Sequence, residues 1–158
     1  MRSLALILLC TSIYLNLSGQ DDKFSQLAQK AYDYMADHVD SCFIYSDSLQ
    51  SIANEENNEL WSEKYKYYKA RCHAHSGEVR EAESLLLSYQ TFAEQSENKQ
   101  EIANTVYELI NVYFKLEDRE SELLFINRGL VLYEELDDRR MIAKCTGQRA
   151  AYAHHPKL

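Results

Sequence analysis

Hydrophobic residues recur every three or four positions along the chain from Phe24 onward. This spacing places them on one face of a helix, and short polar segments interrupt it. The pattern predicts seven helices, with apolar residues at about 24–39, 42–53, 61–74, 79–93, 102–116, 123–136 and 141–151. Because the predicted loops are short, we expect consecutive helices to form antiparallel hairpins, three in number, followed by a last helix without a partner.

Several residues predict where these helices begin and end. Asp40 is a candidate N-cap for the second helix, since its carboxylate can accept hydrogen bonds from the free N–H groups of the next turn. Gly77 is expected to end the third helix in a left-handed conformation. The polar segment Leu136–Asp138 is expected to separate the sixth and seventh helices, and His155 with Pro156 to end the seventh.

The helices repeat at an interval of forty residues. Two similar openings, Ile102-Ala103-Asn104 and Ile142-Ala143-Lys144, stand at matching places, and Gly77 and Glu117 occupy matching turns. A period of this length with two helices in each unit is typical of an α-solenoid, in which each hairpin buries its apolar face against its neighbours. The predicted fold class is therefore all-α, with about three antiparallel helix hairpins and a C-terminal helix.

These repeats resemble the tetratricopeptide repeat family, in a degenerate form of about forty residues that is similar to exported bacterial arrays. The segment 76–82 looks like the family's turn into a second helix, and the resemblance covers residues 24–152. First-helix and second-helix patterns are matched by Val106, Leu109, Tyr113, Leu116, Ile126 and Leu130. The chain departs from the family where Glu117 replaces the turn glycine and Glu122 stands at a small-residue position.

The resemblance implies a concave groove lined by the first helix of each pair. The groove positions in this chain are Lys64, Tyr67, Arg71, Asn104, Tyr107, Asn111 and Lys115. Basic and amide donors of this kind suit an acidic peptide or a C-terminal carboxylate. An ordinary solvated helix face explains the same residues, and this alternative stays open.

Composition and charge narrow the range of partners. The chain has 158 residues with only four glycines and one proline, too few for the turns of a large sheet. Its net charge is −8, and its basic residues do not cluster. Such a chain repels phosphate backbones and anionic lipid headgroups, so we expect no nucleic-acid partner.

The first residues resemble an export signal. A basic start at Arg2, an apolar run from Leu4 to Tyr14 and small residues at Ser18 and Gly19 predict a signal peptide at 1–19 and a repeat domain at 20–158. The apolar run is short for a transmembrane helix, so no membrane span is expected in the mature chain. The predicted location is periplasmic or secreted, and an uncleaved N-terminal anchor is the alternative.

The sequence shows no motif of an enzyme, and we predict no catalytic residue, cofactor or metal ion. Cys72 and His75 share a helix face and could supply two zinc ligands, which leaves a zinc-binding helical protein as a minor alternative. The mature chain keeps Cys42, Cys72 and Cys145. Burial of three free thiols on helix faces is the favoured interpretation, and a bridge between Cys42 and Cys72 is left open.

These observations predict a non-enzymatic extracytoplasmic scaffold that binds peptide or protein partners in a helical groove. A truncated sensory or docking domain of a larger signalling regulator is the main alternative. The apolar face of the last helix consists mostly of Ala143, Ala150 and Ala151, and we expect this face to be available for homodimer formation.

Overall fold

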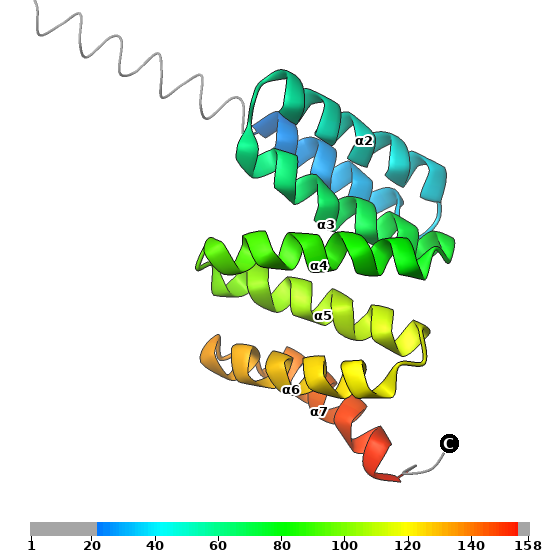
Figure 1. Cartoon of the computed structure of the whole chain (residues 1–158), viewed down its shortest axis with the longest axis vertical. Helices are drawn as coiled ribbons and strands as arrows, with labels where there is room; N and C mark the ends of the chain where they lie inside the picture. The colour runs from blue at the N-terminus through cyan, green and yellow to red at the C-terminus, as the bar shows by residue number, and fades with distance from the viewer. Residues whose placement is uncertain (1–21, 155–158) are drawn as a thin grey trace, which may run out of the picture. The chain divides into compact units, whose positions relative to one another are not determined.

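The computed structural model describes residues 22–154, and all regular secondary structure within that range is helical (Figure 1). After a helix at 22–34, the chain forms α2 (Val39–Glu55), α3 (Glu59–Ser76), α4 (Val79–Gln95), α5 (Lys99–Lys115), α6 (Arg119–Glu135) and α7 (Arg139–His154). The all-α prediction is confirmed. None of the helices in these residues is long and apolar enough to cross a membrane.

The turns between the helices share one backbone geometry. Residues with positive φ recur at twenty-residue intervals, at Asn57, Gly77, Glu97, Glu117 and Asp137. At four of these turns the next N–H bonds back to a carbonyl five residues earlier, as in the bond from Asn58 to the Ala53 oxygen at 2.8 Å. This bond satisfies a carbonyl that the helix end leaves without a partner. The forty-residue interval seen in the sequence is therefore two helix-plus-turn units of twenty residues.

The helix starts follow the same register. A side-chain oxygen accepts a hydrogen bond from the N–H group three residues later at four starts, at distances of 3.1–3.2 Å, and the cap residues are Asn58, Asn98, Asp118 and Asp138. Each cap satisfies one of the free donors of its helix. Glu78 holds the equivalent place before α4 but does not cap the helix, because its carboxylate accepts from Ser76 Oγ at 3.0 Å and lies 2.6 Å from His73 Nδ1.

The prediction that Asp40 is an N-cap is wrong. The first helix ends at residue 34 rather than 39, and α2 begins at Val39 with His38 as its N-cap. Asp40 lies in the first turn of α2, where a carboxylate stabilises the positive end of the helix dipole without being the cap. The predicted stop at residues 155 and 156, like the signal peptide at 1–19, lies outside the described residues.

The turn geometry predicts opposite effects of two substitutions at equivalent positions. Glu117 adopts φ +58°, which costs a residue with a Cβ about 1 kcal/mol, so Glu117→Gly should raise the free energy of unfolding by about that amount. Gly77 has φ +90°, and Gly77→Ala should lower the free energy of unfolding by about 1 kcal/mol or more. Urea denaturation followed by circular dichroism measures both, and a change of equal sign would contradict the turn geometry.

The described residues divide into two compact units, 22–65 and 66–154, with the boundary inside α3. In the first unit the ring of Phe24 stacks on Trp61, with 5.4 Å between the ring centroids. Leu49 and Ala53 of α2 are fully buried. The predicted single repeat domain at 20–158 stays a prediction.

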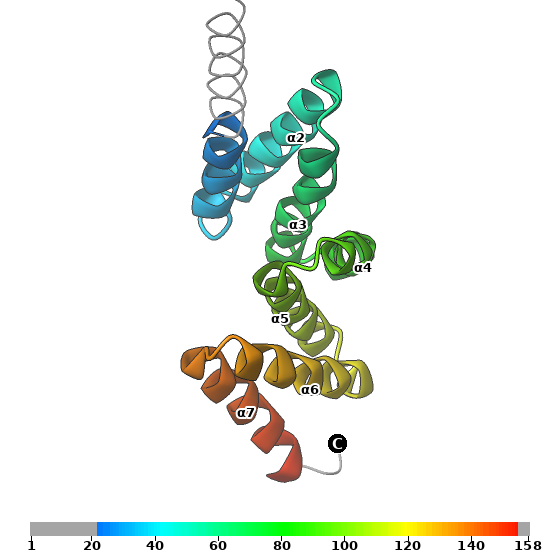
Figure 2. The ribbon, with the colours of Figure 1, turned by 90° about the vertical axis from the view of Figure 1, so that its left-hand side faces the viewer.

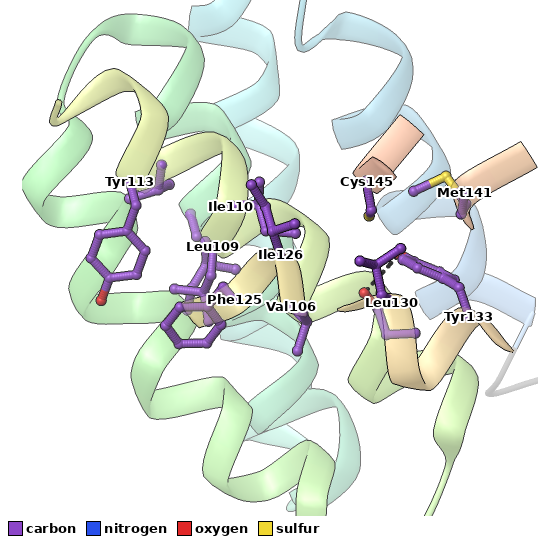
Figure 3. Close-up of a cluster of buried hydrophobic side chains, with 14 of the residues drawn as sticks. Val106, Leu109, Ile110, Tyr113, Phe125, Ile126, Leu130, Tyr133, Met141 and Cys145 are labelled. Carbon is purple, nitrogen blue, oxygen red and sulfur yellow. Dashed lines mark hydrogen bonds between the residues drawn. The ribbon is translucent and has the colours of Figure 1, made fainter. Parts of the chain in front are cut away.

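The second unit contains a hydrophobic core with side chains from α3 to α7. Here α5 packs on α4, α6 packs on α5, and α7 packs on α6 (Figures 1 and 2). Figure 3 shows side chains of α5 and α6 meeting in the core, where the rings of Tyr113 and Phe125 stack at 5.3 Å. The hydroxyl of buried Tyr133 donates to the Ala103 oxygen at 2.9 Å. Sequential packing of helix on helix is typical of a solenoid-like fold, as predicted.

The cysteines differ from the favoured prediction. Cys42 and Cys72 are buried and disulfide-bonded, whereas Cys145 is a buried free thiol. Helix periodicity identified all three as buried positions, but disulfide formation depends on the distance between sulfur atoms, which periodicity does not supply.

Thiol titration tests this assignment. The chain from residue 20, unfolded without reductant, should show one reactive thiol, and reduction should raise the value to three. In the folded protein Cys145 should react slowly, because burial raises its pKa and blocks access of the reagent. Three thiols before reduction would contradict the structure.

Candidate functional site

A cavity of about 240 Å³ lies in the second unit, where α3 and α5 form its walls and α4 contributes one side chain. The lining residues are Ala70, Arg71, Ala74, His75, Leu86, Glu108, Asn111, Val112, Phe114 and Lys115. We call this the α3–α5 cavity. It combines two cations, one carboxylate, one amide and one imidazole with an apolar remainder.

An ion pair fixes the position of Arg71. Its Nε lies 3.0 Å from Glu108 Oε1, and the two side chains are only 15% and 17% exposed. The guanidinium also lies over the ring of Tyr67, 5.4 Å from the ring centroid. Because these contacts come from both α3 and α5, the cation is held in place before any ligand arrives.

The second cation lies on α5. The amino group of Lys115 donates to the carbonyl oxygen of Ala74 in the last turn of α3. A cation is favourable there, since the free carbonyl groups make that helix end negative. Glu108, Asn111 and Lys115 are three and four residues apart, so they share one face of α5 and reach the same cavity.

His75 supplies a titratable group to the cavity. It is exposed and follows Arg71 by one helical turn. Partial burial is the main cause that lowers the pKa of His75, and the positive charges of Lys115 and Arg71 lower it further, against the opposing effect of Glu108. A lowered pKa in the folded state means that His75 favours folding above about pH 6.5 and that this contribution is lost as the pH falls.

The structure brings together only part of the predicted groove. Arg71, Asn111 and Lys115 line the α3–α5 cavity. Tyr67 is packed beneath Arg71 and edge-on against Tyr68, and burial raises its pKa. It therefore positions the guanidinium instead of lining the cavity.

The remaining predicted residues make other contacts. Tyr107 lies under Lys144 of α7, whose amino nitrogen is 5.3 Å from the ring centroid. Asn104 is exposed and accepts a hydrogen bond from Gln100 at 3.0 Å. Lys64 belongs to the first unit, where its amino group lies over Trp61 at 5.4 Å.

Sequence reasoning missed Glu108 and Phe114, and it considered His75 only as a zinc ligand. Glu108 precedes Asn111 by three residues, and Phe114 lies between Asn111 and Lys115 along α5. His75 is one turn beyond Arg71 on α3. Extending each predicted face by one helical turn would have found Glu108 and His75. Phe114 is 65% exposed, an unusual position for a phenylalanine.

The zinc alternative finds no support in the geometry. Cys72 is disulfide-bonded, and a disulfide sulfur is not the thiolate that zinc requires. Within residues 22–154, no cluster of three His, Cys, Asp or Glu side chains is placed to hold a metal ion.

No protein-family model, curated protein or solved structure matches this chain. The resemblance to tetratricopeptide repeats therefore stays a prediction. A solenoid-like fold does not by itself specify a function.

Proposed function

We propose that this chain is a non-enzymatic interaction module that binds a carboxylate-bearing segment of a protein partner in the α3–α5 cavity. The observation that carries the proposal is the convergence of Arg71, Asn111 and Lys115 on one cavity. Guanidinium, ammonium and amide groups are the donors that bind carboxylates in charge-assisted hydrogen bonds. Glu108 offsets one of the two cations, which leaves the cavity positive in a chain whose net charge is −8.

The apolar part of the cavity supports a peptide over a small inorganic anion. Ala74, Leu86 and Val112 contribute apolar lining, and exposed Phe114 adds aromatic surface. Aromatic and aliphatic surface next to fixed donors suits a segment that brings side chains along with its carboxylate. Helix-lined surfaces of repeat proteins bind peptides in this way, as the resemblance to tetratricopeptide repeats implies.

The cysteines also bear on the cellular location of the chain. We propose that the chain is exported, by way of the signal peptide predicted at 1–19, to the periplasm or the medium. Disulfide-bonded Cys42 and Cys72 support this location, because disulfides persist in oxidising compartments and are rare in the cytosol.

A defined probe tests binding: acetylated tri-aspartate with a free carboxyl terminus, compared with acetylated tri-asparagine amide. We expect calorimetry to detect binding of the acidic peptide only. Charge reversal of both cations, Arg71→Glu with Lys115→Glu, should weaken binding about a hundredfold, since each charge-assisted bond contributes about 1.5–3 kcal/mol.

The matched control is Arg80→Glu with Arg139→Glu. This pair changes the net charge by the same amount at exposed positions outside the cavity. It should leave affinity within about twofold, as expected for exposed charges screened by salt. The charge-reversed protein could lose binding because it unfolds. The neutral pair Arg71→Gln with Lys115→Gln controls for this effect and should also weaken binding. Equal losses in the cavity and control pairs would overturn the proposed site.

A further inference from the structure

We propose that His75 is a proton-dependent binding residue, and that the α3–α5 cavity takes up a proton together with its carboxylate ligand. Binding would then be tighter in mildly acidic solution than at neutral pH. This inference rests on the proposed function and adds regulation by pH at the same site.

The geometry places His75 among the groups that would hold the ligand. It lines the same cavity as Arg71, Asn111 and Lys115, at the last turn of α3. It is also exposed, so its ring can exchange protons with solvent while it faces the ligand.

The charged groups around His75 come from two helices. Arg71 belongs to its own helix, and Glu108 and Lys115 belong to α5. From α4 only Leu86 lines the cavity, and it carries no charge. In the turn after α3, the Glu78 carboxylate accepts a hydrogen bond from Ser76 and contacts the ring of His73.

These neighbours make the charge of His75 depend on occupancy. In the empty cavity, partial burial and the two cations oppose protonation and hold the pKa of His75 below its usual value. A carboxylate bound to Lys115 and Arg71 offsets their repulsion and attracts the imidazolium directly, so the pKa rises on binding. By linkage, a ligand that raises this pKa must bind more tightly as the pH falls between the two pKa values.

Calorimetry with acetylated tri-aspartate at pH 7.5 and 5.5 tests this coupling. Aspartate and terminal carboxylates, with pKa values of about 4, stay ionised at both pH values. We expect binding about tenfold tighter at pH 5.5, which corresponds to one pKa unit of coupling. Titrations near pH 6 in two buffers of different ionisation enthalpy should show uptake of a fraction of a proton up to one.

Two variants identify the group. In His75→Gln the ratio between the two affinities should fall to about one, whereas the control His38→Gln, a substitution in the first unit, should keep the tenfold ratio. If the tenfold ratio persists in His75→Gln, the pH dependence comes from a group other than His75 and our inference is overturned. As a second readout, the pKa of the His75 ring, measured by NMR, should rise when the peptide is added.

The outcomes separate this inference from the proposed function. If the peptide binds with equal affinity at both pH values, the role of His75 is overturned and the carboxylate site stands. If it binds at neither pH, both are overturned.

Discussion

Leu109→Ala should lower the free energy of unfolding of the second unit by about 3–4 kcal/mol. Leu109 is fully buried in α5, in the core that joins α5 to its neighbours (Figure 3). Truncation removes the transfer free energy of the side chain and leaves a cavity that the surrounding helices fill only in part. The loss should spread beyond α5, because α4 and α6 each bury a face against it.

Urea denaturation followed by circular dichroism measures the loss, and native-state hydrogen exchange shows its extent. The matched control is Leu124→Ala, at a leucine of α6 that is 66% exposed, where we expect a loss below about 1 kcal/mol. Amides of α4 and α6 should exchange faster in Leu109→Ala along with those of α5. Faster exchange confined to α5 would show that the helices are stable independently and would contradict solenoid-like coupling.

The helices were predictable because their buried residues follow one period. Tyr89, Tyr113 and Tyr133 lie at helical spacing and are buried in the structure. The regular turns were less visible. Gly77 is the only glycine among the described residues with positive φ. At the other four turns, the residue with positive φ is not a glycine, the residue type that most clearly indicates such a conformation from the sequence.

The twenty-residue repeat was nevertheless present in the sequence. The cap residues Asn58, Asn98, Asp118 and Asp138 follow the same twenty-residue interval as the turns. An Asn or Asp side chain there accepts a hydrogen bond from the first turn, which gives the register its physical cause. Asp40 misled the prediction because any carboxylate in a first turn is favourable, whether or not it caps the helix.

The candidate site was predictable only as faces of single helices. Asn111 and Lys115 share a face of α5 by helical spacing, and both line the cavity. Which neighbour a face meets depends on packing between helices. Tyr107 meets Lys144 of α7 instead of the cavity, and Arg71 meets Glu108, contacts that no local pattern contains.

The ion pair between Arg71 and Glu108 leads to the second large effect. Arg71→Met should lower the free energy of unfolding by about 2–3 kcal/mol, because it leaves the Glu108 carboxylate mostly buried without its cation. Breaking a fully buried pair costs about 3–5 kcal/mol. The expectation here is lower, because each side chain keeps about a sixth of its surface in water.

A double-mutant cycle separates charge from packing. Glu108→Gln in the Arg71→Met background removes the stranded carboxylate, so the double variant should be less destabilised than Arg71→Met alone, by about 1–2 kcal/mol. Urea denaturation of the four proteins at one pH gives the coupling energy. If the double variant is as unstable as the single one, the loss comes instead from the methylene stem and guanidinium of Arg71 packed over Tyr67. A pronounced recovery would mean that the charge pairing of Arg71 with Glu108, rather than packing alone, stabilises this part of the fold.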